Sequence, residues 1–339
     1  MTIGLNGFGR IGRQVLRALA QRQPDVRVAA INDLIDIKTS AHLLKYDSVY
    51  GAYPGRVEVD GDALVVDGVA IRYLSERDWS LLPWGDLGAS VVIEATGVGT
   101  QRERAAKHLD AGATKVLISA PGTDADVTIV LGVNDDAYDP ARHDVISNAS
   151  CTTNGLAPPV HVVHQEFGVL KGMMTTVHAY TASQVLVDGP AGDLRDARAA
   201  GLSIVPTSTG AARAIGLVIP ELQGKLNGAA YRVPVPTVSI VEFVVQLAKP
   251  AGAEAINDAL RAAADGRLDG ILDVSDEPLV SIDLRGNTHS SIVDLGSTMV
   301  VGDDLVKVAA WYDNEWGYAC RVADVVALIA QSVTAKTPV

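Results

Sequence analysis

The start of the chain alternates short apolar runs with amphipathic helical patterns. Residues 2–6 form an apolar run of strand length that leads into a glycine-rich turn and then into the helical pattern IGRQVLRALAQR. A second apolar run, 26–32, ends at Asp33. The same alternation predicts buried strands at 91–95 and 116–119 and a helix from about 101 to 111. Short apolar runs separated by helices are typical of a buried parallel sheet.

The pattern changes twice along the chain. Between 55 and 74, two Asp-Gly turns separate short alternating runs, which predicts antiparallel hairpins inserted into the first pattern. From near Asn148 onward, apolar runs predict a mostly antiparallel sheet, covered by helices such as AEAINDALRAAAD. These runs are GMMTTVHAY, AAYRVPV, VSIVEFVVQLA, SIVDL and LVKVAAWY. The sequence therefore predicts an α/β protein with two domains.

The glycine-rich turn is the first candidate for chemistry. It reads Gly7-Phe8-Gly9-Arg10-Ile11-Gly12, directly between the predicted strand and helix. Glycines let backbone approach a pyrophosphate, the helix start offers N–H groups, and Asp33 suits ribose hydroxyls. Glycines alone also mark plain turns, but strand, helix and acid together favour a dinucleotide site. We therefore interpret residues 1–150 as a Rossmann-type dinucleotide-binding domain, completed by a C-terminal helix at 316–334, and 151–315 as a second domain.

Charge and cysteine content narrow the function classes. The formal net charge of -12 argues against a general nucleic-acid or membrane surface, so any phosphate site is expected to be local. The N-terminus shows no leader pattern and no apolar stretch is long enough to span a membrane, which favours a cytoplasmic location. The 2 cysteines, Cys151 and Cys320, are too few for a disulfide framework and lack zinc-site spacing, so no metal is expected.

Cys151 is the candidate nucleophile. Ser150 is a good helix N-cap, and the apolar residues after it recur with helical period, so Cys151 is expected in a first turn. A thiol with a pKa near ~8.5 is mostly protonated at neutral pH, whereas a helix start and a nearby imidazole lower that pKa. A buried structural cysteine is the alternative, and the flanking Ser and Thr hydroxyls count against it.

A histidine partner is expected among the 7 histidines of the chain. We expect His108 and His143 to be exposed, and His161 and His164 to lie on the helix after Cys151, away from its start. His178 follows the strand-like run GMMTTV, so it is expected at a strand end near the domain junction. A structural histidine is the more common reading of such a position, and spacing alone leaves both open.

Several segments resemble the phosphorylating glyceraldehyde-3-phosphate dehydrogenase family along essentially the whole chain. The matching segments are NGFGRIGR, HLLKYDSVYG, SNASCTTN, HAYTASQ, PTSTGAARAIG, RVPVPTVS and WYDNEWGY. The resemblance implies that Cys151 attacks the aldehyde to give a thiohemiacetal and that His178 accepts its proton as hydride leaves. Inorganic phosphate then attacks the resulting thioester, which makes 151–315 the catalytic domain.

The resemblance also implies two phosphate sites and a cofactor site. Groups for the attacking phosphate are Ser150, Thr152, Thr209 and Gly210, and groups for the substrate's phosphate are Thr181, Arg232 and, less closely matched, Arg198. Cofactor contacts are implied at Gly7, Gly9, Arg10, Ile11, Gly12, Asp33, Arg77, Ser119 and Asn314. Hydroxyls, backbone N–H groups and guanidinium groups are the usual phosphate donors. Leu34 and Gly189-Pro190 resemble the NAD-using pattern, so NAD is the expected cofactor.

Two departures and two alternatives accompany the resemblance. Gly155 stands where many members have a second cysteine, so no disulfide can form there, and Asp196 replaces an arginine near the implied substrate-phosphate side. The segment 183–203 has little regular period and in the family contributes to tetramer contacts, so a homotetramer is expected. The alternatives are oxidation of erythrose 4-phosphate, whose enzymes lack the PTSTGAA phosphate site, and a non-catalytic NAD-binding scaffold.

Overall fold

The computed structural model describes residues 1–334. They form two compact units. The first unit comprises Met1–Ile129, Asp136–Ala149 and the chain from Ala319 onward. The second unit comprises Val130–Asp135 and Ser150–Tyr318. The C-terminal helix α8 (Trp316–Thr334) therefore begins in the second unit and runs on as part of the first.

The first unit is built on a nine-stranded sheet with the order β3-β4-β5-β2-β1-β6-β7-β9-β8. Its strands are β1 (Thr2–Asn6), β2 (Arg27–Asn32), β3 (Val57–Asp60), β4 (Ala63–Val66), β5 (Val69–Leu74), β6 (Val91–Glu94), β7 (Lys115–Ile118), β8 (Val127–Thr128) and β9 (Val145–Ser147). All pairings from β5 to β8 along this order are parallel. The predicted parallel sheet is confirmed.

The segment expected as an inserted pair of hairpins is part of the same sheet. β3, β4 and β5 pair in antiparallel fashion, as the Asp-Gly turns predicted. β5 also pairs in parallel with β2, with Ala30 opposite Arg72. The hairpins thus extend the parallel sheet at one edge, because β5 provides backbone groups on both sides.

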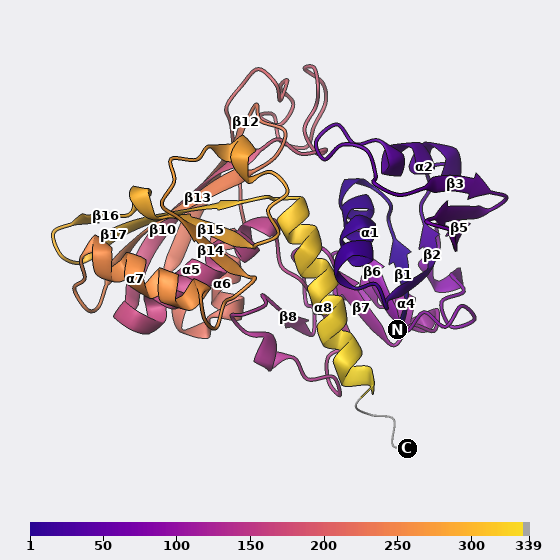
Figure 1. Cartoon of the computed structure of the whole chain (residues 1–339), viewed down its shortest axis with the longest axis horizontal. Coiled ribbons are helices and arrows are strands. Elements are labelled where there is room, and N and C mark those ends of the chain that lie inside the picture. Colours follow the sequence, from indigo (N-terminus) through magenta and orange to yellow (C-terminus); the bar gives the residue numbers. More distant parts are fainter. Residues whose placement is uncertain (335–339) are drawn as a thin grey trace. The chain divides into compact units, whose positions relative to one another are not determined.

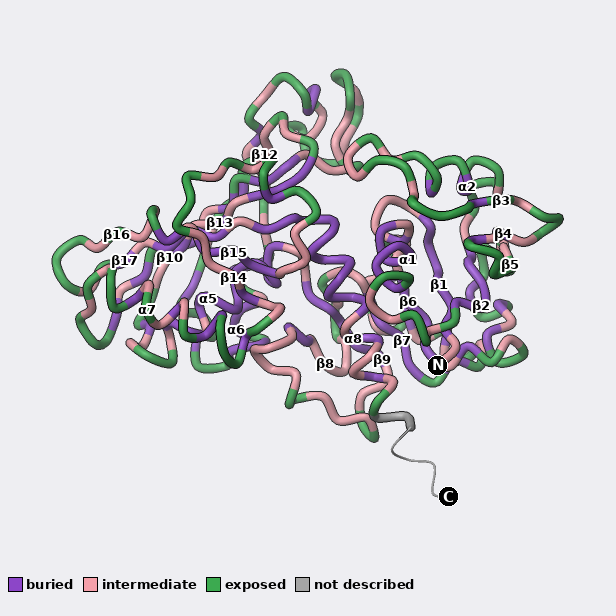
Figure 2. Tube along the Cα trace, in the orientation of Figure 1, coloured by how far each residue is buried: buried purple, intermediate pink, exposed green. Residues whose placement is uncertain are grey.

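Helices flank the first sheet. They are α1 (Arg10–Arg22), α2 (Ile37–Lys45), α3 (Arg102–Ala105), α4 (Lys107–Asp110) and the later part of α8. The single helix expected over 101–111 is broken at Ala106 into α3 and α4. Figure 2 shows β1 and β6 buried, whereas the hairpin of β3 and β4 reaches an exposed tip. The core of this unit therefore lies along its central strands.

The second unit is built on an eight-stranded sheet. Its main order is β11-β12-β10-β13-β17-β15-β14, with β16 paired to β17. The strands are β10 (Val169–Ala179), β11 (Val205–Thr207), β12 (Leu226–Val233), β13 (Ser239–Leu247), β14 (Leu272–Ser275), β15 (Ser291–Asp294), β16 (Met299–Val301) and β17 (Leu305–Tyr312). The pairs β10–β12 and β14–β15 are parallel and the other pairs are antiparallel, so the expected mostly antiparallel sheet is confirmed.

Three α-helices that lie wholly within the second unit accompany this sheet (Figure 1). They are α5 (Cys151–Phe167), α6 (Ala211–Val218) and α7 (Ala253–Ala264). Helix α5 packs against β13, β15 and β17 and contacts α6 and α7. Short 3-10 helices lie at Trp79–Leu81, Asp135–Ala137, Pro220–Leu222, Ser281–Leu284 and Leu295–Ser297. Among residues 1–334, no helix is long and apolar enough to cross a membrane.

Candidate active site

Cys151 is the first residue of α5, as the sequence predicts. Ser150 is the N-cap, and its hydroxyl accepts a hydrogen bond from the Thr153 N–H at 3.0 Å. The residue before the cap, Ala149, has a φ of 53°. A non-glycine residue in this region costs about 1–3 kcal/mol, and such strain clusters at functional sites. The sequence thus places the thiol at the start of a helix, where the N–H groups of Cys151 and Thr152 hydrogen-bond to its sulfur.

His178 lies beside the thiol. It stands near the end of β10, and its Nε2 atom is 3.5 Å from Sγ of Cys151. The other ring nitrogen, Nδ1, is 2.7 Å from the carbonyl oxygen of Ala179. Only 4% of the His178 surface is exposed. The expected proximity of the two side chains is therefore confirmed. In the tautomer whose Nδ1 donates to the carbonyl, Nε2 can accept a proton.

Arg232 joins this pair from the neighbouring strand. In the parallel pairing of β10 and β12, Arg232 stands opposite His178. Its Nη1 atom contacts Nδ1 of His178 and donates to the carbonyl oxygen of Ala179 at 3.2 Å. The structure therefore brings a fixed positive charge to the thiol–imidazole pair, on the side of the ring away from the sulfur.

Burial opposes the thiol activation expected from the helix start. It raises the pKa of the Cys151 thiol, and the nearby Arg232 guanidinium only partly offsets this. Burial, with Arg232 as the second cause, lowers the pKa of His178 to about 3. The expectation of a lowered thiol pKa is corrected accordingly, because removing a group from water disfavours its charged form. At neutral pH the pair holds a thiol and a neutral imidazole that can accept its proton.

Tyr312 packs against His178 of the thiol–imidazole pair, and the sequence analysis did not single it out. Its ring meets the His178 ring edge-on, with centroids 5.9 Å apart. Its hydroxyl lies 2.9 Å from that of Thr152 and 2.8 Å from that of Thr176. A Cβ placed on Gly155 would lie 2.9 Å from this ring, so glycine lets Tyr312 approach α5. The signal was present in the matching segment WYDNEWGY, where only Asn314 was singled out.

The residues expected at the phosphate sites are distributed unevenly. Ser150 and Thr152 flank the thiol, although Thr152 is 5% exposed and its hydroxyl is engaged by Tyr312. The Thr209 hydroxyl accepts from the Ala211 N–H at 3.1 Å, and Gly210 is the N-cap of α6. These two residues therefore form a second helix start in the same unit.

The other two candidates for the substrate's phosphate lie in a segment without helix or strand. The hydroxyl of Thr181 is 2.9 Å from that of Ser183. Arg198 forms an ion pair with Asp188 at 2.9 Å, and both side chains are largely exposed. Neither is brought to Cys151 by a contact within the second unit, whereas Arg232 is. The strand register explains the difference, since only Arg232 is fixed in the sheet.

Asn314 is buried near the same strand ends. It follows β17 and is 4% exposed, and its Oδ1 accepts a hydrogen bond from the Ser239 hydroxyl at 2.9 Å. Ser239 also accepts from the Ala179 N–H at 3.0 Å. Ser239 was not among the predicted residues. A serine at the second position of the apolar run VSIVEFVVQLA was the available signal, because a polar residue buried in a strand needs partners.

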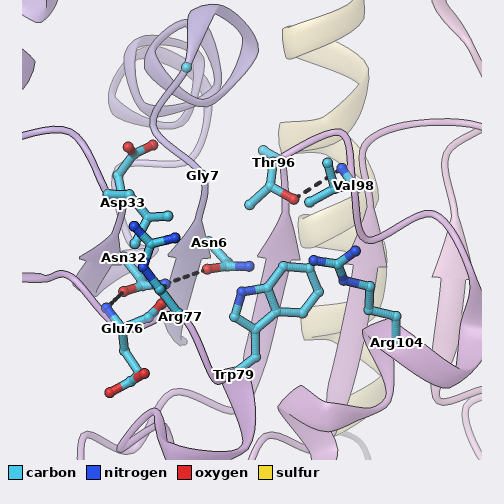
Figure 3. A pocket seen from close by; sticks show the side chains of 13 residues that line it. Asn6, Gly7, Asn32, Asp33, Glu76, Arg77, Trp79, Thr96, Val98 and Arg104 are labelled. Carbon is cyan, nitrogen blue, oxygen red and sulfur yellow. Dashed lines mark hydrogen bonds between the residues drawn. The ribbon is translucent and has the colours of Figure 1, made fainter.

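The first unit contains a cavity of about 420 Å³ at the glycine-rich turn (Figure 3). Its lining includes Gly7, Gly9, Asp33, Leu34 and Arg77 among the predicted positions. Further lining residues are Asn6, Asn32, Glu76, Trp79, Ala95, Thr96, Val98 and Arg104. The carboxylate of Asp33 accepts hydrogen bonds from the N–H groups of Phe8 at 2.5 Å and Ile35 at 2.8 Å. This acid therefore holds the turn as well as lining the cavity.

The glycines fit the backbone of a dinucleotide site. Gly7 has a φ of 95°, and a Cβ there would lie 2.5 Å from the Thr96 nitrogen. A Cβ on Gly12 would lie 2.1 Å from the Gly7 oxygen, whereas one on Gly9 would meet nothing within 4 Å. No side chain caps α1, and its first turn has no acidic residue. A helix start of this kind binds phosphate groups, so the residues present fit a dinucleotide such as NAD.

Five expected cofactor residues lie outside the cavity lining, namely Gly12 and Asn314, described above, and Arg10, Ile11 and Ser119. Arg10 is ion-paired with Asp47 at 2.8 Å. Ile11 follows in the first turn of α1, partly exposed. The Ser119 hydroxyl donates to the carbonyl oxygen of Glu94 at 3.0 Å. The side chains of Arg10 and Ser119 are thus engaged within the protein, and any contact to a cofactor would come from backbone or from the cavity rim.

His108 is buried, contrary to the expectation that it is exposed. Its Nδ1 accepts a hydrogen bond from Nε1 of Trp84 at 3.1 Å, and its Nε2 lies 3.2 Å from Glu94. The ring stacks on Trp79 with centroids 5.0 Å apart. Polar sequence neighbours suggested exposure, but α4 turns this one side chain inward against two tryptophans. Trp79 also lines the cavity, and in Figure 3 it lies between Asn6 and Arg104.

Comparison with known proteins connects both units to one family. Residues 1–102 match the model of the glyceraldehyde 3-phosphate dehydrogenase NAD binding domain, and residues 150–314 match that of the C-terminal domain. A glyceraldehyde-3-phosphate dehydrogenase of Geobacillus stearothermophilus is 58% identical over 97% of this chain and 98% of its own length. Glyceraldehyde-3-phosphate dehydrogenase 1 of Bacillus subtilis is 56% identical over 97% and 98%. The enzyme of Mycolicibacterium smegmatis is 55% identical over 98% and 99%.

Proposed function

Since this chain belongs to the glyceraldehyde-3-phosphate dehydrogenase family, we propose that it oxidises glyceraldehyde 3-phosphate with NAD and inorganic phosphate to 1,3-bisphosphoglycerate. The observation that carries the proposal is the 3.5 Å contact between Cys151 Sγ and His178 Nε2 at the start of α5. We assign NAD binding to residues 1–150 with helix 316–334, and catalysis to residues 151–315. The cavity beside Gly9 and Asp33 supports the first assignment.

The chemistry begins with the thiol. Sγ of Cys151 bonds to the aldehyde carbon while its proton passes to Nε2 of His178, and His178 then gives this proton to the carbonyl oxygen, which becomes the thiohemiacetal hydroxyl. The hydride acceptor for this carbon would be supplied by NAD when it is bound. His178 takes the hydroxyl proton as the hydride leaves, and the carbon becomes a thioester. The neutral imidazole that burial maintains at Nε2 supports this role.

Phosphate groups complete the reaction. An oxygen of inorganic phosphate attacks the thioester carbon, the carbon–sulfur bond breaks, and the sulfur takes a proton back from His178, which restores the thiol and leaves an acyl phosphate as product. We assign the attacking phosphate to Ser150, Thr152, Thr209 and Gly210, and the substrate's phosphate to Thr181, Arg198 and Arg232. Arg232 is the best supported, because it already touches His178. Arg198 would have to exchange Asp188 for the substrate.

The test of this function is NADH formation measured by absorbance with glyceraldehyde 3-phosphate, with and without inorganic phosphate. We expect sustained turnover only when phosphate is present, since the thioester needs an acceptor. Full independence of phosphate would refute the acyl-phosphate step. Faster turnover with erythrose 4-phosphate would favour that alternative substrate, and no turnover with either aldehyde would leave the non-catalytic scaffold.

We further propose a homotetramer that acts in the cytoplasm. The segment 183–203 exposes several large apolar side chains on a single chain, with exposed fractions of 87% at Leu186 and 86% at both Leu194 and Leu202. Apolar side chains gathered in one such segment mark interaction sites. Neither Cys151 nor Cys320 forms a disulfide, which fits a reducing compartment.

Light scattering is expected to give four times the chain mass of 35.5 kDa. Leu186→Asp with Leu202→Asp is expected to lower this mass, because each change places a charge on the exposed apolar segment. The control is Leu81→Asp. Leu81 belongs to the first unit and is 69% exposed, and this variant is expected to keep the full mass. A monomeric mass for the unsubstituted chain would contradict the tetramer.

A further inference from the structure

We propose that Ser239 is a positioning residue, which fixes the orientation of the Asn314 amide so that its NH₂ group is presented to the nicotinamide amide of NAD. The inference rests on the proposed function, in which Asn314 is the nicotinamide contact. Ser239 itself is assigned no contact with cofactor or substrate.

The hydrogen bonds around Ser239 favour one arrangement, in which the Tyr312 hydroxyl is a further partner. The Ala179 N–H is 3.0 Å from Oγ of Ser239, and a backbone N–H can only donate. Oγ therefore accepts there, and its own proton is directed to Oδ1 of Asn314 at 2.9 Å. An amide whose oxygen is held in this way must present its nitrogen on the other side. The orientation of Asn314 thus follows from the chemistry of its partner.

Burial makes this orientation costly to reverse. Ser239 is 1% exposed and Asn314 is 4% exposed. If the Asn314 amide turned over, its Oδ1 would lose the Ser239 proton, and that proton would have to turn to the Tyr312 hydroxyl, which already bonds to Thr152 and Thr176. Unpaired polar groups away from water are unfavourable, so the protein holds one amide orientation before any ligand arrives.

The backbone in front of Ser239 supports a built arrangement. Val238 has a φ of 63°, a left-handed conformation that is a genuine outlier for a β-branched residue. Its side chain is buried in a cluster with Leu284 and Ile292. On the other side of Val238, the Thr237 hydroxyl donates to Oδ1 of Asp313 at 3.2 Å. The segment 237–239 therefore hydrogen-bonds to two consecutive residues, Asp313 and Asn314, through one hydroxyl each.

Ser239 also touches the strand that carries His178. Its partner Ala179 offers its N–H to Ser239, while the Ala179 carbonyl oxygen faces Nδ1 of His178. Ser239 therefore also contacts the backbone that holds His178, so its replacement can affect the thiol through His178 instead of NAD binding through Asn314. The experiment must separate these two routes.

The test is a double-mutant cycle on the full-length protein with Ser239→Ala, Asn314→Ala and the double variant. The NAD dissociation constant is measured by calorimetry, together with KM for NAD, kcat and the alkylation rate of Cys151 by iodoacetamide. We expect Ser239→Ala to weaken NAD binding about tenfold, equal to about 1.4 kcal/mol. In the Asn314→Ala background the same change is expected to shift binding less than twofold, and the alkylation rate is expected to stay unchanged.

Thr237→Val is the matched control, because it removes the neighbouring hydroxyl of the same segment and leaves Ser239 with Asn314. It is expected to retain NAD affinity. Equal weakening by Ser239→Ala in both backgrounds, or slower alkylation in both, would overturn the proposal and assign Ser239 to the Ala179 route. If Ser239→Ala fails to fold, Asn314→Asp keeps the acceptor for Ser239 and lacks the amide donor. It must then weaken NAD binding as Asn314→Ala does, and wild-type affinity would overturn the proposal.

Failure of the proposed function would look different. If Asn314→Ala binds NAD with wild-type affinity, the assignment of Asn314 to the nicotinamide is wrong, and the role of Ser239 falls with it. If Asn314→Ala weakens binding while Ser239→Ala does not, only the positioning role is wrong. Turnover of the unsubstituted protein, measured separately, decides the overall reaction.

Discussion

Replacing Cys151 by serine is expected to lower the rate of NADH formation by at least about 10⁴-fold, equal to about 5 kcal/mol in the activation barrier. A serine hydroxyl is a far weaker nucleophile than a thiol at neutral pH, and His178 would have to remove a much less acidic proton. No thioester can form in the variant. The measurement is steady-state turnover with glyceraldehyde 3-phosphate, NAD and phosphate.

The variant is expected to bind NAD with unchanged affinity, because the glycine turn and Asp33 belong to the first unit. Calorimetry with NAD therefore also shows that the protein is folded. Cys320→Ala is the control. Cys320 is fully buried within α8, so this change is expected to preserve turnover and single labelling by iodoacetamide. A serine variant that keeps more than about one hundredth of the activity would show that the Cys151 thioester is not required.

Replacing His178 by asparagine is expected to lower kcat by about 10³-fold, within the range typical of a lost general base. The sign of the pH dependence follows from burial. With a pKa of about 3, His178 is neutral across the working range and can accept the thiol proton. Without His178, alkylation of Cys151 depends on loss of the thiol proton to solvent. Because burial raises the pKa of this thiol, the variant is expected to react slowly at pH 7 and faster as the pH rises.

The measurement is the rate constant of iodoacetamide alkylation against pH for both proteins. The wild type is expected to react faster at neutral pH, with the difference narrowing at higher pH. His164→Gln, which removes another histidine of the second unit, is expected to leave the profile unchanged. Superimposable profiles for wild type and His178→Asn would show that the 3.5 Å contact has no role in proton transfer.

The sequence predicted the parts of the site that depend on local pattern. Ser150 as a cap, Cys151 in a first turn and the glycine turn between strand and helix are all encoded within a few residues. Identifying the histidine that partners the thiol required knowledge of tertiary packing. His178 could be placed at a strand end by pattern, but its choice over the other histidines came from resemblance, because the distance to Cys151 depends on how β10 packs beside α5.

Features set by tertiary packing were missed for the same reason. His108 reads as a polar helix residue, yet the two tryptophans around it determine its burial. Arg232 reads as a phosphate ligand, and only the register of β12 against β10 brings it onto His178. The raised pKa of Cys151 likewise reflects desolvation by surrounding side chains, a property that no local motif contains.

The discontinuous first unit has a consequence for synthesis of the chain. Fully buried residues of α8, among them Val322, Val326 and Ile329, belong to that unit, and Asp324 pairs with Arg22 of α1 at 3.0 Å. Translation proceeds from the N-terminus at about 5–20 residues per second. Synthesis of β9, the last strand of the first sheet, and synthesis of α8 are therefore separated by roughly ten to thirty seconds. During that interval the apolar surface that α8 will cover is exposed to solvent on the nascent chain. Chaperones that bind apolar surfaces can therefore bind the first unit at this stage.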